Sequence, residues 1–464
     1  MKNSLTTSNK PKLGPILKFL LPSLLGIFLF MLPIPYGDSL TIPIAILSSS
    51  LQSLLANYML YILFIVVALS AIGSIITKLC KPKFILGNQF LTLLFNPSGI
   101  WFILRLIAFF FISIIFLVHK GWMPSTLLSF AEIINSSDTG GLVVGDLLPI
   151  LFSIFLFAGV FLPLLLNFGL LEFIGCLLAN VMRPIFGLPG RAAIDCIASW
   201  LGDGTIGVLL TSRQYEEGFY TEREAVVIGT TFSLVSITFS LVVINNVGLG
   251  HLFVPFYLTV TVASLIAAVI MPKLPPLSLK KDVLYDGSLP NLNESNNLKK
   301  SSFKVGFDTA IAKAESQDFI KCTVIDGIKN VLDMWIGVIP VVLAVGTIAL
   351  ILATYTPLFE ILGIPFIPFL NLLGIPEAGA AAQTLVAGFA DMILPSILAS
   401  SIESEMTRFI IACVSVTQLI YLSEVGSLLL GSKIPVKLWE LFIIFIERTL
   451  ITLPIIALIA HIIF

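Results

Sequence analysis

Long apolar stretches that carry almost no charge constrain this chain more than any other feature. Since 57% of its residues are hydrophobic and 11% are charged, it has too few polar side chains to cover a water-facing surface. A helix needs about 20 apolar residues to cross a bilayer. The sequence therefore predicts an all-α polytopic membrane protein with about nine transmembrane helices, at residues 14–34, 54–79, 100–119, 143–166, 223–245, 251–272, 334–355, 406–430 and 438–463.

Positive charges gather on one side of these predicted spans. Lysines precede the first span and follow the second, arginines flank the fourth and fifth, and residues 273–333 carry nine lysines. Because Lys and Arg collect in cytoplasmic loops, we expect a multi-pass protein of the cytoplasmic (inner) membrane with a cytoplasmic N-terminus. The Lys-, Asn- and Pro-rich residues 273–303 predict a mobile loop, and residues 304–332 predict an amphipathic helix on the membrane surface.

Two further apolar segments, residues 187–213 and 374–403, do not fit as spans. Each contains polar residues midway and is followed almost at once by a predicted span. The sequences "GDGT" at 202–205 and "ADMILPS" at 390–396 supply the Gly and Pro that interrupt a helix. We therefore expect two re-entrant helical hairpins, each made of two half-helices that meet at a tip inside the membrane.

The two hairpin regions resemble each other and predict an internal repeat. Residues 171–203 align with 358–391: an acidic residue and Gly, then GLP or GIP, then an Ala-rich arm, then Asp at the break. The lysine pattern makes the units enter from opposite faces, which is the inverted repeat of many secondary transporters. The predicted domains are N-terminal scaffold helices (1–142), a first repeat (143–272), a cytoplasmic polar loop with an amphipathic helix (273–333) and a second repeat (334–464).

This arrangement, with "GLPGRAAIDCIASWLGDGTIGVLLTSRQYEEGFYTEREAVVIGTTFSLVSITF" at 187–239, resembles the nucleoside-recognition Gate-domain membrane proteins, most closely the YjiH-like family. The resemblance covers roughly residues 145–464. It implies a fold related to the concentrative nucleoside transporters and to the gate repeats of bacterial ferrous-iron transporters. The hairpins lack the Gln and Glu pattern of nucleoside ligands and the Gly-Cys motif of the iron gates, so the resemblance implies a fold without naming a substrate.

Acidic residues near the breaks are the main candidates for a binding site. A carboxylate near the membrane midplane costs a few kcal/mol unless water, a partner or a ligand compensates it. Asp203 and Asp391 occupy equivalent tips, and each either binds a solute or caps the next half-helix. Asp195 lies where the second hairpin has Gln383, and it either binds a coupling ion or pairs with Arg191 one turn earlier.

The spans after the hairpins also match, with "TFSLVSITF" at 231–239 opposite "TQLIYLSEV" at 417–425. Their hydroxyl groups bind either a ligand or their own helix backbone. Glu424 has no Lys or Arg within a turn and is a functional candidate, whereas Arg448 is expected to pair with Glu447. The predicted substrate-binding residues are Asp203, Gly204, Thr205, Asp391, Ser396, Ser236, Gln383, Tyr421 and Glu424, and the predicted ion-coupling residues are Asp195, Thr238 and Ser423.

These residues predict a secondary transporter of a small polar solute, namely an amino acid, an amine or a nucleoside-like molecule. Acids outnumber cations in the candidate set, so the empty site is expected to be anionic and to take a cation, with Na⁺ or H⁺ as the coupling ion. Two alternatives stay open: a non-transporting component of a membrane complex, of the spore-maturation type, and an ion channel.

Other functional classes are not expected. The chain has no Walker A loop, HExxH motif or Ser/His/Asp set, which argues against an enzyme. Its five cysteines and three histidines are scattered, so no metal site and no cofactor other than the coupling ion are predicted. The expected partners are a small-molecule substrate, the lipid bilayer and a second copy of the chain in a homo-oligomer, with no nucleic acid.

Overall fold

The described part of the protein is almost wholly helical. The computed structural model describes residues 13–32, 34–36, 39–97, 99–201, 204–232, 235, 237–290 and 303–464. Two short antiparallel strands, β1 (Ile34–Tyr36) and β2 (Ser39–Thr41), follow the first helix. Within the described ranges, seven helical segments are long and apolar enough to cross a membrane: Leu13–Met31, Pro43–Cys80, Gly99–His119, Gly140–Leu166, Gly250–Lys273, Lys321–Tyr355 and Leu438–Ile463. The predicted all-α polytopic membrane fold is therefore confirmed.

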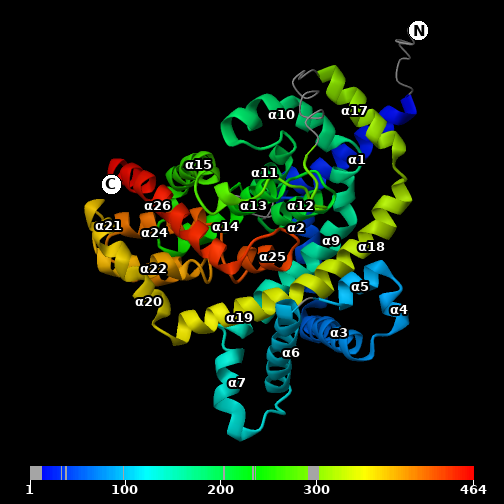
Figure 1. Ribbon diagram of the computed structural model, residues 1–464. Coiled ribbons are helices and arrows are strands. Elements are labelled where there is room, and N and C mark those ends of the chain that lie inside the picture. Colours follow the sequence, from blue (N-terminus) through cyan, green and yellow to red (C-terminus); the bar gives the residue numbers. More distant parts are fainter. Residues whose placement is uncertain are drawn as a thin grey trace, which may run out of the picture.

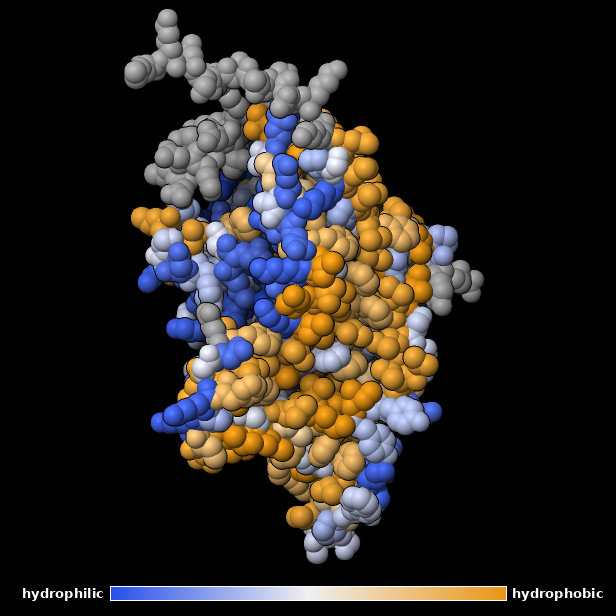
Figure 2. Space-filling model, turned by 90° about the vertical axis from the view of Figure 1, so that its right-hand side faces the viewer, coloured by the Kyte–Doolittle hydropathy of each residue, from blue (hydrophilic) through white to orange (hydrophobic). Residues whose placement is uncertain are grey.

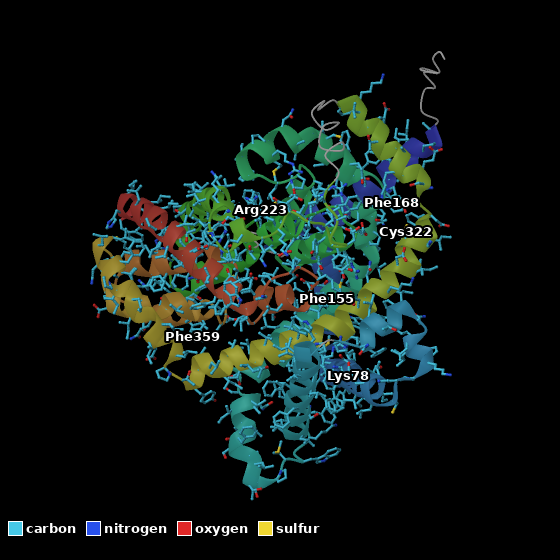
Figure 3. All side chains as sticks on the ribbon, viewed as in Figure 1. Lys78, Phe155, Phe168, Arg223, Cys322 and Phe359 are labelled. Carbon is cyan, nitrogen blue, oxygen red and sulfur yellow. The ribbon has the colours of Figure 1, made fainter. Side chains whose placement is uncertain are left out.

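The surface agrees with this fold class. Many large apolar side chains are exposed, including Leu54, Leu258 and Leu458. Figure 2 shows apolar side chains over much of one face, with the polar side chains gathered in patches instead of spread evenly. The interior is apolar as well, and Figure 3 shows the fully buried Phe155 near the middle of the molecule. An apolar exterior around an apolar core is what a lipid solvent allows.

The N-terminal helices pack together and against the rest of the chain. Helix α3 lies against α6, α1 and α2 lie against α9, and α6 lies against α19. Ser70 of α3 donates a hydrogen bond of 2.7 Å to the carbonyl of Ile336, which joins this part to the second half of the chain. The N-terminal elements are α1 (Leu13–Met31), α2 (Pro43–Leu55), α3 (Met59–Cys80), α4 (Lys83–Leu86), α5 (Gln89–Phe95), α6 (Gly99–His119) and α7 (Leu128–Asn135). The two later helices that they contact are α9 (Leu148–Leu166) and α19 (Ile339–Tyr355).

Two later units share one order of elements. Each begins with a π-helical turn and a spanning helix that has Pro in its first turn, and continues with a surface helix, two short helices, an interrupted helix and a final span. The first unit comprises α8 (Gly140–Leu142), η3 (Val143–Leu147), α9 (Leu148–Leu166), α10 (Leu170–Phe186), α11 (Ala192–Leu201), α12 (Gly204–Glu216), α13 (Glu222–Thr231), α14 (Ile237–Asn246) and α15 (Phe253–Ile270).

The second unit repeats this order with one exception. It comprises η8 (Met334–Val338), α19 (Ile339–Tyr355), α20 (Leu358–Gly363), α21 (Ile367–Leu372), α22 (Ala378–Ala387), α23 (Leu394–Ala399), α24 (Glu405–Thr417), α25 (Val425–Gly431) and α26 (Leu438–Ile463). Two helices, α20 and α21, stand in place of the single helix α10. The π-helical turns before Pro149 and Pro340 are a shared feature that the sequence comparison did not use. The domain boundaries given above remain a prediction.

The short helices of each unit form a hairpin. Helix α11 packs against α12, and α22 packs against α23. Helices α11 and α12 have 10 and 13 residues, so each is about 15–20 Å long and too short to cross a hydrocarbon core of about 30 Å. In Figure 1, α10 lies near the top of the molecule and α20–α21, from which the second hairpin starts, lie at its left edge. The first tip, at residues 202 and 203, lies outside the described residues.

Two of the expected spans are wrong as continuous helices. The span predicted at 223–245 consists of α13 and α14, which are separate because α13 ends at Thr231. The span predicted at 406–430 consists of α24 and α25, and α24 ends at Thr417. Apolar composition predicts that a segment is buried in the membrane, but it does not reveal a break that contacts from other helices stabilise.

The expectation for the polar insert is wrong in part. Residues 291–302 of the predicted mobile loop lie outside the described residues. Residues 274–290 are folded against the helices, with Leu277 fully buried and Lys280 forming a 2.9 Å ion pair with Glu440 of α26. The backbone N–H groups of Glu222 and Arg223 donate to carbonyls of this segment, at 2.8 and 3.1 Å. The predicted surface helix is two helices, α17 (Phe303–Ser316), which packs on α1 and α10, and α18 (Asp326–Asp333), with the π-helical turn η7 (Lys321–Ile325) before α18.

Candidate functional site

The second hairpin tip and the interruption between α24 and α25 form one hydrogen-bonded unit. The N–H groups of Leu422 and Ser423 donate to the carbonyls of Phe389 and Ala390, at 2.8 and 2.9 Å. The Ser423 hydroxyl donates to Asp391 Oδ2 at 2.7 Å, and the backbone N–H of Ile393 donates to Asp391 Oδ1 at 2.8 Å. Asp391 thus both stabilises the turn of the hairpin and binds the neighbouring interrupted helix.

Two side chains of the interruption satisfy backbone groups that the break leaves unpaired. The Tyr421 hydroxyl lies 2.8 Å from the carbonyl of Ser415 and 3.1 Å from that of Val416, and it accepts from the N–H of Leu419. Gln418 Nε2 donates to the carbonyl of Leu385 at 2.8 Å and so reaches the second hairpin. Both side chains are almost fully buried. Breaking a helix inside a membrane requires such replacements for the lost hydrogen bonds.

Arg448 in the middle of α26 contacts both interrupted helices. Its Nε donates to the carbonyl of Thr417, and its Nη1 donates to the carbonyl of Thr231 at 3.0 Å. The predicted pair with Glu447 does not form. Adjacent residues on a helix point in different directions, so the guanidinium and the Glu447 carboxylate do not face each other. The side chain of Arg448 is fully buried.

The two units also pack across each other. Asn246 of α14 donates to the Ser396 hydroxyl of α23 at 3.3 Å. The backbone N–H of Lys433, just after α25, donates to the Ser212 hydroxyl of α12, also at 3.3 Å. The second half of each interrupted helix therefore lies against the hairpin of the other unit. A solute site at this place would be formed by both repeats.

Asp195 holds the first hairpin together. Its carboxylate accepts hydrogen bonds from Thr211 at 3.0 Å and Gln214 at 2.5 Å, both on α12, and from the Tyr220 hydroxyl at 3.0 Å. Only 1% of Asp195 is exposed. Of the two alternatives left open for Asp195, the pair with Arg191 is not formed, because Arg191 pairs with Glu172 at 3.1 Å and lies over the ring of Phe219.

A small cavity adjoins Asp195. Its lining residues come from the first hairpin and from α13, and its size admits about one water molecule. The lining is Asp195, Ser199, Gly207, Val208, Ile228, Gly229 and Phe232. A carboxylate at the edge of a cavity of this size provides oxygen ligands for a small cation or a place for a proton.

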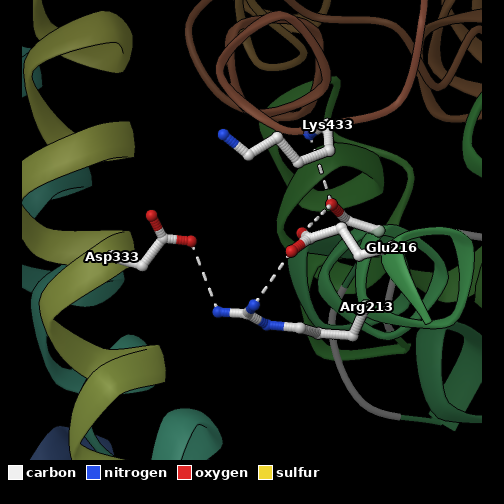
Figure 4. A network of polar contacts seen from close by, with 5 residues as sticks. Arg213, Glu216, Asp333 and Lys433 are labelled. Atoms are coloured by element: carbon white, nitrogen blue, oxygen red, sulfur yellow. Dashed lines mark hydrogen bonds and ion pairs between the residues drawn. The ribbon is translucent and has the colours of Figure 1, made fainter. Parts of the chain in front are cut away.

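A charged network closes the edge of the first hairpin. Arg213 of α12 pairs with Glu216 at 3.1 Å and with Asp333 at the end of α18 at 3.3 Å. Figure 4 shows Arg213 between these two carboxylates, with Lys433 on the far side of Glu216. Burial raises the pKa of Glu216 against the opposing effect of Arg213. The network therefore links the first hairpin to the helix that precedes the second unit.

The predicted site residues fall into three groups. Asp391, Ser423, Tyr421 and Glu424 lie together at the second tip and interruption, with Ser396 on the adjoining α23, and Asp195 lies in the first hairpin. Gly204 and Thr205 open α12, while Gln383 is exposed on α22. Asp203 and Ser236 lie outside the described residues, as does the side chain of Thr238.

Several residues at the site were not predicted. They are Thr211, Gln214, Tyr220 and Arg448. Arg448 carried a signal, since it is a cation in the middle of a long apolar stretch with no acid a helical turn away. The donors around Asp195 carried none, because their polar groups meet the carboxylate only after the hairpin has folded.

Two comparisons with known proteins bear on this chain. A profile of the Gate family, described as nucleoside recognition, matches residues 148–250. The match begins at the first residue of α9 and ends just after α14, so it covers the first hairpin and the first interrupted helix. The chain is also 49% identical to an uncharacterized protein of Alkalihalophilus pseudofirmus, over 100% of this chain and 96% of that protein. The chain belongs to the Gate family.

The Gate-family match includes the first hairpin and the residues around Asp195. In this Gate-family protein, the matched residues carry Asp195, the cavity beside it and Thr231, which Arg448 contacts. The structure adds a second unit of the same element order, which supplies Asp391 and the second interruption. These two buried carboxylates, Asp195 and Asp391, therefore come one from each unit.

Proposed function

We propose that this Gate-family protein is a secondary transporter of a small polar solute, with its site between the hairpins and the interrupted helices near the membrane midplane. The observation that carries the proposal is the unit formed by Asp391, Ser423 and the interruption after Thr417. A buried acid at a hairpin tip beside an interrupted helix is costly in a membrane and is typical of a solute or ion pathway. We also propose that the protein lies in the cytoplasmic membrane, with its N-terminus on the lysine-rich, cytoplasmic side.

The chemistry of the site favours a solute with an amine or several hydroxyl groups. An ionised carboxylate has about four acceptor positions, and Asp391 uses two of them for Ser423 and Ile393. The remaining positions accept from an ammonium, an amide or a sugar hydroxyl. Amino acids, amines and nucleoside-like molecules all carry such donors, and these are the proposed substrate classes.

We propose Asp195 as the coupling residue. Its carboxylate adjoins a cavity that admits about one water molecule, which suits Na⁺ or a proton better than an organic solute. The hydrogen bonds from Thr211, Gln214 and Tyr220 fix its position on the first hairpin, so that occupancy of the cavity bears directly on the packing of α11, α12 and α13.

Ligand-induced stabilisation of the purified protein tests the proposal. Panels of nucleosides, amino acids and amines are added with and without Na⁺ to the parent and to Asp391→Asn, and Asp138→Asn serves as a control on an exposed residue. A ligand at 100 times its Kd stabilises the folded state by about 2.7 kcal/mol. We expect at least one solute to stabilise the parent and the control but not Asp391→Asn.

Flux through liposomes separates the proposal from its rivals. A transporter gives uptake that saturates with solute and depends on a Na⁺ or pH gradient. An ion channel gives flux that neither saturates nor couples, and a complex component gives no flux and tolerates Asp391→Asn. If every effective solute stabilised the parent and Asp391→Asn equally, Asp391 would not be part of the solute site.

A further inference from the structure

Arg448 is a buried cation whose charge is not balanced by an acid. Its side chain is fully buried in the middle of α26, and no ion pair among the described residues involves it. A cation at the centre of a membrane is costly unless nearby groups compensate its charge. Among the described residues, the hydrogen bonds to the carbonyls of Thr231 and Thr417 are what compensates the charge of Arg448.

Those two carbonyls lie at equivalent points of the two units. Thr231 is the last residue of α13, and Thr417 is the last residue of α24. They are also the first residues of the aligned stretches "TFSLVSITF" and "TQLIYLSEV". Each helix presents the negative end of its dipole there, equivalent to about half an elementary charge. Two such ends supply about one negative charge in total, which matches the single positive charge of a guanidinium.

A single arginine, on the final span of the second unit, contacts the interrupted helices of both units. Helix α15, the final span of the first unit, has no charged residue, whereas α26 of the second unit carries Arg448. A planar guanidinium can donate in two fixed directions at once, which a lysine ammonium on a flexible stem does less well. Arg448 Nη2 has no hydrogen-bond partner among the described residues, so any movement that withdraws one helix end leaves Nε or Nη1 without a partner as well.

We propose that Arg448 is a positioning residue that joins the C-terminal ends of α13 and α24, so that the two helix ends are held in one relative position. Neighbouring contacts on α26 serve one unit only. Thr449 accepts from Gln418 Nε2 at 3.0 Å, and Thr452 lies 3.3 Å from Thr417 Oγ1, and both partners belong to the second unit. Arg448 is distinguished from these residues by its bond to the first unit.

Hydrogen–deuterium exchange of the purified full-length protein tests this proposal without any solute. In Arg448→Met, amide exchange is expected to rise about tenfold at the ends of both α13 and α24, because each loses a hydrogen bond to a charged group. In the matched control Thr449→Val, exchange is expected to rise near Gln418 only. Helices α3 and α6 report whether the fold as a whole has loosened.

Arg448→Lys provides the same test if Arg448→Met does not fold. Exchange is then expected to rise at both helix ends by a smaller factor. The proposal is overturned if either Arg448 variant affects only one of the two ends, or if Thr449→Val affects both ends as strongly. Because no solute enters the experiment, its failure would leave the proposed transport function untouched, and the reverse also holds.

Discussion

At the scale of single residues, Asp195 is defined by the donors that surround it. Thr211, Gln214 and Tyr220 all donate to its carboxylate. Replacement by Ala leaves the buried donors of Gln214 and Tyr220 without an acceptor, whereas the Thr211 hydroxyl keeps the carbonyl of Gly207 at 2.9 Å. Each such donor costs about 1–3 kcal/mol. Asn behaves differently, because Gln214 Oε1 has no partner among the described residues and can accept from the new amide after the Gln214 side chain turns over.

We therefore expect Asp195→Ala to lower the free energy of unfolding by at least about 2 kcal/mol, and Asp195→Asn to lower it by no more than about 1 kcal/mol. The same Asn variant is expected to abolish any dependence of solute binding on Na⁺ or pH, since the charge is lost. Thermal unfolding in one detergent, with and without Na⁺, measures both effects. An Asn variant that keeps its ion dependence would exclude Asp195 as the coupling residue.

Tyr421 offers a second test at this scale. Its hydroxyl bonds to backbone groups of its own interruption, which indicates a structural role for a residue predicted to bind substrate. We expect Tyr421→Phe to destabilise the protein by about 1–2 kcal/mol and to leave the rank order of stabilising solutes unchanged. Unchanged stability together with an altered rank order would instead place the hydroxyl in the solute site.

At the scale of elements, close contact between helices sets the shape of the first hairpin. A Cβ at Gly207 of α12 would lie 2.6 Å from Ser199 Cβ of α11. Gly207→Ala is therefore expected to push the arms apart and destabilise the protein by about 1–3 kcal/mol. Gly379, at the start of α22, has no atom within 4 Å of such a Cβ and serves as the matched control.

Gly379→Ala is expected to be neutral or to stabilise the protein by up to about 1 kcal/mol, because Ala favours a helix over Gly. Thermal unfolding of the two variants gives the comparison. Equal effects of the two substitutions would contradict the packing described for α11 and α12.

Most of the helices and hairpins could be predicted from the sequence, and the elements that could not be predicted have physical causes. Apolar length identified seven of the nine predicted spans as continuous helical segments, and Gly, Pro and Asp identified both hairpins. The interruptions after Thr231 and Thr417 could not be predicted, because Arg448 and the backbone of the second hairpin stabilise them from far along the chain. The folded segment 274–290 is similar, since Lys280 gains its partner Glu440 only in the assembled structure.

At the scale of the whole molecule, two units of one element order pack into each other. The Gate-family match covers most of the first unit, and the alignment of Asp203 with Asp391 extends the pattern to the second. The position of Gln383 shows the limit of such an alignment. Gln383 was placed opposite Asp195, yet it is exposed on α22 while Asp195 is buried between α11 and α12.

The ion pair between Arg213 and Asp333 gives a prediction at the scale of the whole molecule, because it joins the first unit to the helix before the second unit. A double-mutant cycle with Arg213→Gln and Asp333→Asn is expected to give a coupling energy of up to about 1 kcal/mol at low salt, falling as salt is added. The more exposed pair Arg223 and Asp282, at 3.8 Å, is the control and is expected to couple less. A larger coupling for the control pair would reverse this ranking.

An experimental density map of the protein in a lipid bilayer tests the central claim most directly. The account predicts that residues 187–213 and 374–403 each enter and leave the membrane on one side, that the two sides are opposite, and that Asp391 faces the interruption after Thr417. A map in which either segment crosses the bilayer, or in which both enter from the same side, would contradict it.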